Sequence, residues 1–258
     1  MPSPTDTAPI ISLRNVKKAF GPKVIYEDCS LDIYAGETIT IIGGSGTGKS
    51  VTLKMLIGLL QADAGSIQVY GTEVRGLGEP GLLPIRRRVA MLFQGAALFD
   101  SLTVEQNIKY PLREHRWGDE KRLDERVEEV LEMVGLPGSQ KLKPSELSGG
   151  MRKRVGLARA IAVEPDVILY DEPTTGLDPI NVRRINGLIL SLQEKLKVTS
   201  IVVTHDMDAC FTFTDRIALL YERRFAFVGT QEEARASDNH YLQEFIAGGR
   251  GTLDKDVT

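Results

Sequence analysis

Residues 43–50 have the types and spacing of a phosphate-binding loop. Glycines let backbone N–H groups approach an anion closely, and the start of a following helix adds partial positive charge. In such a loop Lys49 reaches the β- and γ-phosphates, and the hydroxyl of Ser50 is a ligand for Mg²⁺. The segment lies between an apolar run at 37–42 and a helical pattern at 48–60, as this chemistry requires. The predicted nucleotide-binding residues here are Gly43, Gly44, Ser45, Gly46, Thr47, Gly48, Lys49, Ser50 and the adjoining Val51.

Two carboxylates follow a second apolar run. Residues 167–170 read Val-Ile-Leu-Tyr and precede Asp171 and Glu172. A buried strand that ends in acids presents them at the edge of a parallel sheet where nucleotides bind. Asp171 is then expected to hold Mg²⁺, and Glu172 to orient or deprotonate the attacking water. Alone, these acids could be a solvated strand end; together with the loop they predict nucleotide hydrolysis.

A second glycine-containing segment precedes another helix. Residues 147–151 read Leu-Ser-Gly-Gly-Met, so Ser148 is a candidate N-cap, and Gly149 and Gly150 allow close backbone approach. The start of that helix would be a second anion site. One chain has a single γ-phosphate to bind, which suggests that two subunits share each nucleotide.

Composition limits the remaining possibilities. The chain has 258 residues and a formal net charge of -3, which gives no basic field for nucleic acid. No apolar run approaches the roughly 20 residues of a membrane-spanning helix, and residues 1–9 lack a signal sequence. We therefore expect a cytosolic protein that needs another polypeptide for any membrane process. Cys29 and Cys210 are expected to be buried thiols in a reducing compartment.

The apolar pattern places these motifs in an α/β protein. Strands are expected at 10–16, 30–33, 37–42, 66–70, 88–93, 167–170, 200–204, 217–221 and 225–228, and helices at 48–60, 127–134 and 182–196. Alternating strands and helices predict a mostly parallel sheet with helices on both faces. The stretch 97–163 is expected to be a helical insert in a domain of residues 1–247, and residues 248–258 to be a flexible tail.

These motifs, in this order, resemble those of an ABC transporter ATPase over nearly the whole chain. The resemblance implies a P-loop NTPase (RecA-like) core with an N-terminal antiparallel β subdomain and a helical subdomain. It implies that Ser148, Gly149 and Gly150 contact ATP bound to the opposite subunit of a homodimer. Gln94 corresponds to the glutamine that senses Mg²⁺ and the attacking water. The remaining matches are Asp178 in the D-loop, His205 as the switch histidine at the γ-phosphate, and Phe20 as the aromatic residue that stacks on adenine.

Some positions depart from the common pattern. Met151 stands where Gln is commoner, Thr175 and Gly176 stand where Ser and Ala are usual, and Phe20 replaces Tyr. The segments 91–99, 110–115 and 141–146 resemble the ATPases of Mla phospholipid transporters and their Mce-associated relatives. That likeness implies phospholipid or other hydrophobic cargo moved between inner and outer membranes. Expected partners are a dimeric permease, an Mce-domain lipid-binding protein and a small STAS-type subunit, at the cytoplasmic face of the inner membrane.

Other interpretations remain. The chain could serve an importer of a small polar solute, and the residues around Gln94 and 110–115, which face the permease, would decide. A soluble ABC protein of translation or DNA repair would have two cassettes or a long coiled coil. A silent binding subunit would lack intact Lys49, Asp171, Glu172 or His205. His115 and His240 are expected at the surface, and the basic run 86–88 on a solvated face.

Overall fold

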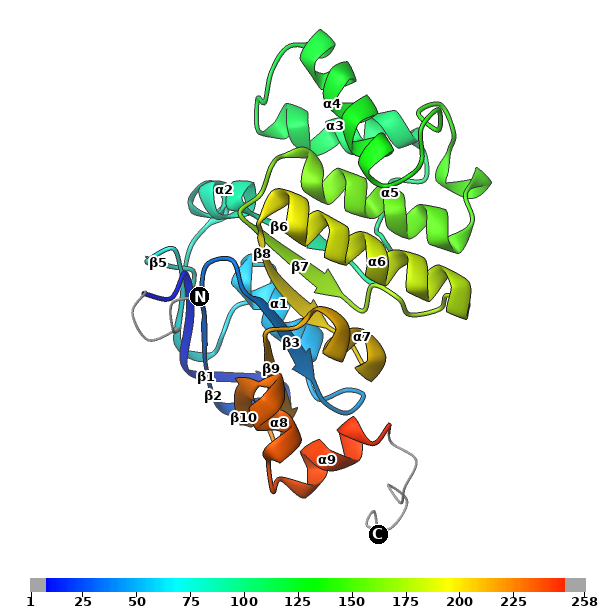
Figure 1. Cartoon of the computed structure of the whole chain (residues 1–258). Helices are drawn as coiled ribbons and strands as arrows, with labels where there is room; N and C mark the ends of the chain where they lie inside the picture. Colours follow the sequence, from blue (N-terminus) through cyan, green and yellow to red (C-terminus); the bar gives the residue numbers. More distant parts are fainter. Residues whose placement is uncertain (1–7, 249–258) are drawn as a thin grey trace.

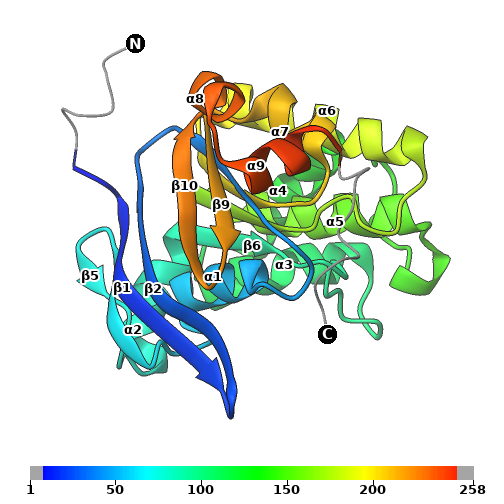
Figure 2. The ribbon, with the colours of Figure 1, turned by 90° about the horizontal axis from the view of Figure 1, so that it is seen from below.

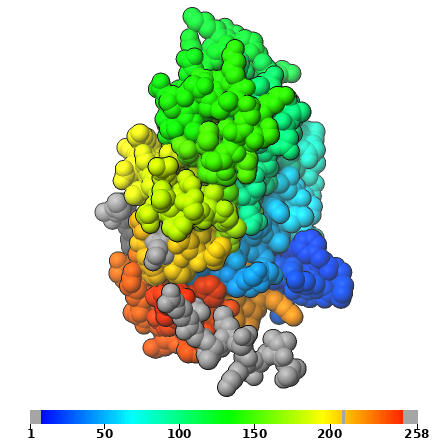
Figure 3. Space-filling view, turned by 90° about the vertical axis from the view of Figure 1, so that its right-hand side faces the viewer, coloured from blue at the N-terminus to red at the C-terminus, as the bar shows by residue number. Residues whose placement is uncertain are grey.

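Two sheets and a helical lobe make up the part of the chain that the computed structural model describes, residues 8–248 without the side chains of 208 and 209. Figure 1 shows the lobe at one end of the molecule and the last two helices at the other, and Figure 3 shows the same order on one face. All of the predicted flexible tail after Gly248 lies outside the described residues.

The larger sheet has six strands, in the order β10-β9-β3-β8-β7-β6, and several of the predicted motifs lie where its strands end. All neighbouring strands are parallel except the β9–β10 hairpin. Every residue of β3, β7 and β8 is buried, which is why these strands read as continuous apolar runs. The expected α/β class is confirmed. The strands are β3 (Thr38–Ile42), β6 (Val89–Leu92), β7 (Val167–Asp171), β8 (Thr199–Val203), β9 (Arg216–Tyr221) and β10 (Arg224–Thr230).

A four-stranded antiparallel sheet holds the N-terminal strands, in the order β2-β1-β4-β5. Its strands are β1 (Ile11–Phe20), β2 (Lys23–Ile33), β4 (Ala64–Val69) and β5 (Thr72–Glu73). This confirms the expected antiparallel unit, although a strand limited to 30–33 was wrong. β2 begins earlier, at Lys23. The prediction missed this part of the strand because exposed Glu27 and Asp28 precede buried Cys29 and interrupt the apolar pattern. β2 lies beside β10, as Figure 2 shows.

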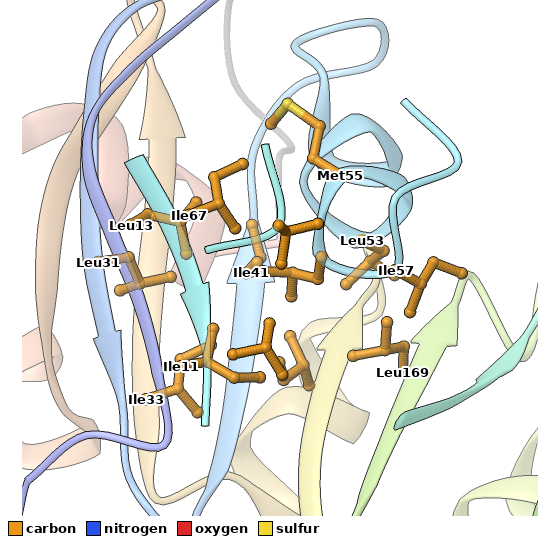
Figure 4. Packing of buried hydrophobic residues seen from close by; sticks show 14 of the residues in the cluster. Ile11, Leu13, Leu31, Ile33, Ile41, Leu53, Met55, Ile57, Ile67 and Leu169 are labelled. Carbon is orange, nitrogen blue, oxygen red and sulfur yellow. The ribbon is translucent and has the colours of Figure 1, made fainter. Parts of the chain in front are cut away.

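Helix α1 (Lys49–Leu56) packs between the two sheets. In Figure 4, Leu53 and Met55 of this helix lie in one cluster with Ile11 and Leu13 of the small sheet and Ile41 of the large one. All five side chains are fully buried. The loop before α1 is therefore anchored to both sheets, and close packing of this kind holds a site rigidly.

The helical lobe contains α3 (Val104–Glu114), α4 (Glu120–Met133) and α5 (Gly149–Ala162), which all lie within the stretch 97–163. Thr103 closes a capping box at the start of α3, and Asp119 caps α4. These helices share a second hydrophobic core with α6 (Pro179–Leu196). The lobe therefore has its own core against the large sheet.

Four short helices were not predicted: α2 (Glu79–Arg88), α7 (Met207–Phe213), α8 (Gln231–Ala236) and α9 (His240–Ile246). Each has ten residues or fewer, so its apolar pattern spans too few turns to be read, and α2 also contains Pro84. His240 is exposed as expected, and His115 is partly exposed, which agrees with its placement at the surface. Within residues 8–248, no helix has both the length and the apolarity to span a bilayer.

Candidate active site

One cleft of about 390 Å³ opens where β3, β6, β7 and β8 end. Parallel strands place their carboxyl ends at one edge, so residues far apart in the sequence meet there. Among the predicted residues, Gly44, Thr47 and Asp171 adjoin the cleft without lining it. The lining residues are Ile25, Gly43, Ser45, Gly46, Gly48, Lys49, Ser50, Val51, Gln94, Glu172 and His205.

The phosphate loop has the backbone form that its glycines allow. Gly43, Gly46 and Gly48 have φ angles of 153°, 74° and 109°. A Cβ atom at Gly48 would lie 2.3 Å from Cγ2 of Ile25, so that position requires glycine. The Lys49 ammonium donates to the carbonyls of Gly43 and Gly44, at 2.9 and 3.0 Å. The cation is therefore held over its own loop, where a phosphate would meet it.

Burial lowers the pKa of Lys49, and the carboxylates of Glu172 and Asp171 partly offset that effect. A half-desolvated cation gains more from a phosphate than one in water, because the local dielectric constant is lower. The electrostatics of the cleft therefore favour an anion beside Lys49.

Ser50 and Asp171 form an oxygen pair suited to a hard cation. The hydroxyl of Ser50 donates to Oδ1 of Asp171 at 2.5 Å, and Asp171 is almost fully buried. Mg²⁺ is usually held by one or two protein oxygens together with phosphates and water. No group of three or more His, Cys, Asp or Glu side chains that could hold a metal exists within residues 8–248. The donor set therefore fits a magnesium ion that arrives with a nucleotide.

Glu172 is held in place by several neighbours. Its φ is 49°, an uncommon left-handed conformation for a residue with a side chain. Its N–H donates to the carbonyl of Val203 at 2.9 Å. Its Oε2 accepts from the Thr175 hydroxyl at 3.1 Å and lies 2.7 Å from Nδ1 of His205. The carboxylate and the imidazole are thus oriented together toward the cleft.

The second glycine segment lies outside this cleft. Ser148 caps α5 by accepting from the N–H of Met151 at 3.2 Å. Asp178 caps α6, and the N–H groups and side chain that it accepts from hold its pKa below the usual range. A Cβ atom at Gly150 would lie 2.9 Å from Oδ1 of Asn181, so the two helix starts are packed together. Ser148, Gly149, Gly150 and Asp178 are not among the described residues that line the cleft.

Phe20 is 45% exposed and does not line the cleft; its nearest described polar partner is the Lys18 ammonium, 5.1 Å from the ring centre. Two residues to which the sequence analysis gave no role in the site do contribute. Ile25 forms a wall against Gly48, and Thr175 orients Glu172. Thr175 carried a signal, because a hydroxyl three residues after a catalytic acid can reach back to it; Ile25 carried none.

An apolar groove of about 380 Å³ lies on another side of the segment that follows β6. Of six exposed large apolar side chains in the described chain, three line it: Leu59, Phe99 and Tyr110. Arg86, His115 and Arg159 also line it, and none of the described lining residues is acidic. Gathered exposed apolar residues mark an interaction surface.

Comparisons with known proteins agree with this geometry. The family model described as ABC transporter matches residues 26–175. A probable ribonucleotide transport ATP-binding protein, mkl, of Mycobacterium leprae is 41% identical over 93% of this chain and 69% of its own. The intermembrane phospholipid transport system ATP-binding protein MlaF of Haemophilus influenzae is 38% identical over 93% and 90%. The dimeric post-hydrolysis structure of the ATP-binding cassette MJ0796 with ADP and Pi is 32% identical, with a TM-score of 0.78 over 85% and 98% of the two chains.

Proposed function

This chain belongs to the ABC transporter family and is an ATPase, and from that premise we propose that it energises phospholipid transport between two membranes through a separate permease. The observation that carries the ATPase function is the cleft, in which Lys49, the Ser50–Asp171 pair and the Glu172–His205 pair converge. The phospholipid cargo rests on the likeness to MlaF.

We assign the following roles. The loop amides and Lys49 bind the phosphates, and Ser50, Asp171 and Gln94 would hold Mg²⁺, which supplies charge neutralisation when bound. Glu172 accepts a proton from the attacking water, and His205 fixes that carboxylate and faces the γ-phosphate. These groups act mainly by positioning the reactants and by stabilising charge in the transition state.

We infer that two copies close around two ATP molecules. Within the described chain, Ser148, Gly149 and Gly150 do not line the cleft, yet they offer helix N–H groups for an anion. A partner copy would bring this helix start, with Asp178 beside it, to the other copy's nucleotide. The dimeric MJ0796 structure supports such an arrangement. Phe20 is assigned to the adenine.

We assign the apolar groove to a cytoplasmic segment of the permease. Phe93 lines the groove and the adjacent Gln94 lines the cleft, so one short segment adjoins both sites. An apolar surface with basic residues and without acidic ones suits a helix that has an apolar face and a carboxylate. An Mce-domain lipid-binding protein, a STAS-type subunit and a peripheral place on the cytoplasmic face of the inner membrane complete the proposal.

A ribonucleotide is a second candidate cargo. The chain is more similar to mkl, which is named for ribonucleotide transport, than to MlaF. A pull-down of tagged protein from native membranes, with identification of bound proteins and lipids, separates the two. Recovery of a permease with an Mce-domain protein and phospholipid supports our proposal. Recovery of a permease with a solute-binding protein and no lipid overturns the cargo and leaves the ATPase function standing.

The variant Glu172→Gln tests the mechanism. It keeps the shape of the side chain and removes the base, so we expect ATP turnover to fall by roughly 10² or more. ATP binding should survive, and a closed dimer should accumulate in size-exclusion chromatography with ATP. Turnover close to that of the unaltered protein would remove Glu172 from this role.

A further inference from the structure

The three consecutive basic residues on α5 are Arg152, Lys153 and Arg154, and their side chains bind different parts of the fold. Arg152 donates to the carbonyl of Leu147 at 2.7 Å, and Arg154 to that of Gly135 at 2.9 Å. These two bonds fasten α5 to its own lobe. Lys153 instead points out of the lobe toward the cleft, where no role has been assigned to it.

Lys153 contacts the backbone of two residues that the mechanism uses. Its Nζ donates to the carbonyl oxygen of Gln94 and to that of Glu172, the latter at 3.2 Å. β6 and β7 are adjacent parallel strands, so the residues that follow them lie at the same edge. One ammonium group therefore joins α5 to both segments.

The ammonium group of Lys153 is buried, which costs desolvation free energy. The residue is only 6% exposed, and burial lowers its pKa, while Asp171 and Glu172 act in the opposite sense. Burying an ammonium group costs free energy that carbonyl bonds and nearby carboxylates must offset. Within residues 8–248, Lys153 forms no ion pair with a described carboxylate, so its direct partners are the two carbonyls.

The bond to Glu172 holds a strained residue. Glu172 has a φ of 49°, and its N–H is already fixed to Val203. Lys153 fixes its carbonyl, so the backbone is held on both sides while the side chain meets Thr175 and His205. Without that bond, the left-handed conformation would lose one of the contacts that maintain it.

We propose that Lys153 is a positioning residue for hydrolysis, whose ammonium group keeps the Gln94 and Glu172 segments in a fixed relation to α5. Movement of the helical lobe then reaches both segments through one side chain. The inference rests on the proposed ATPase function, and it adds a link between the start of α5, which would serve the partner's nucleotide, and the chain's own catalytic carboxylate.

Three substitutions test this. Lys153→Met keeps length and loses every donor, Lys153→Gln keeps a donor without charge, and Lys153→Arg keeps both charge and donors. Lys121→Met is the control, because Lys121 is 86% exposed on α4 and has only a 3.9 Å ion pair with Glu125. Steady-state ATP hydrolysis, ATP affinity by titration and thermal unfolding are measured for each.

We expect kcat of Lys153→Met to fall roughly tenfold or more, with the Kd for ATP within about twofold, since only the hydrolysis step depends on the position of Glu172. Lys153→Arg should recover most of kcat, and Lys153→Gln should be intermediate. Hydrogen exchange should quicken in residues 94–97 and 172–176 of the Met variant. Tm should fall only slightly, because the two carbonyls lose a donor while the cost of burying the charge disappears.

Two results would overturn the proposal. One is a kcat of Lys153→Met equal to that of Lys121→Met. The other is a parallel fall in kcat, Tm and ATP affinity that Lys153→Arg does not relieve, which indicates a purely structural role. Failure of the ATPase function itself would look different, because the unaltered protein would then not hydrolyse ATP.

Discussion

The polar cleft and the apolar groove lie on two sides of one short segment, and they differ in how their side chains are satisfied. In the cleft, Lys49, Ser50 and Glu172 all have hydrogen-bond partners within the chain. In the groove, Phe99 and Tyr110 are nearly half exposed, and their ring centres lie 4.9 Å apart. The chain's own hydrogen bonds therefore hold the side chains of the cleft, whereas the groove retains an apolar surface that a partner can cover.

The segment between the two regions is held under strain. Ala96 and Ala97 have φ angles of 62° and 48°, which are uncommon for residues with a side chain. The guanidinium of Arg159 donates to both of their carbonyls at 2.7 Å. Farther along, the buried amide of Asn107 holds Phe99 through its N–H and carbonyl. Such a segment keeps one shape, so a displacement in the groove can be passed to Gln94.

The largest effect is expected from a substitution that impairs ATP binding in the cleft and leaves the groove unchanged. Lys49→Ala removes the cation beside the phosphates, so ATP affinity should fall about 10- to 100-fold, the usual worth of a charge-assisted bond. Binding to permease-containing membranes should persist, because the groove is untouched. Titration with a fluorescent ATP analogue and membrane co-sedimentation provide the two readouts. Loss of both would show that the two regions are not separable.

A smaller effect is expected from a change in the groove. Phe99→Asp places a carboxylate among apolar residues that a partner would cover, so membrane co-sedimentation should weaken about tenfold. Leu83→Asp is the matched control, because Leu83 is 49% exposed on α2 and outside the groove. ATP affinity should stay within about twofold. Equal behaviour of the two variants on membranes would argue against the groove as the docking surface.

The smallest effect concerns the two native thiols. Cysteines introduced into the cleft and the groove could carry labels that compare the two regions, provided that the native thiols do not react. Burial raises the pKa of Cys29 to about 12 and that of Cys210 to about 11. The unfolded thiols ionise near pH 8.5, so above that pH the unfolded state binds fewer protons and stability falls. Between pH 8.5 and 9.5 we expect a loss of about 1 kcal/mol per thiol in urea unfolding.

The double variant Cys29→Ala and Cys210→Ala should flatten this alkaline decline. In the folded protein, neither thiol should react with a maleimide at pH 7, because buried thiols are inert. Rapid labelling of the unaltered protein would contradict the burial of both residues.

Much of the cleft could be foreseen from the chain. Glycine at 43 and 48 and the two acids where β7 ends are local patterns whose chemistry does not depend on distant residues. The parallel order of the strands then makes their ends meet, since right-handed crossovers leave few alternatives. The roles given to Gln94, Asp178, His205 and Phe20, and the contact of residues 148–150 with the partner's ATP, came from resemblance and stay predictions.

By itself, the sequence determined that this chain has a phosphate loop, a carboxylate pair and a second glycine-containing helix start, because glycine, lysine and acidic residues act through fixed local geometry. Only the tertiary structure decided that Lys153 joins the Gln94 and Glu172 segments and that Leu59, Phe99 and Tyr110 form one groove. A lysine in a basic run or an exposed aromatic residue has no local signature, since its role depends on which distant backbone folds against it.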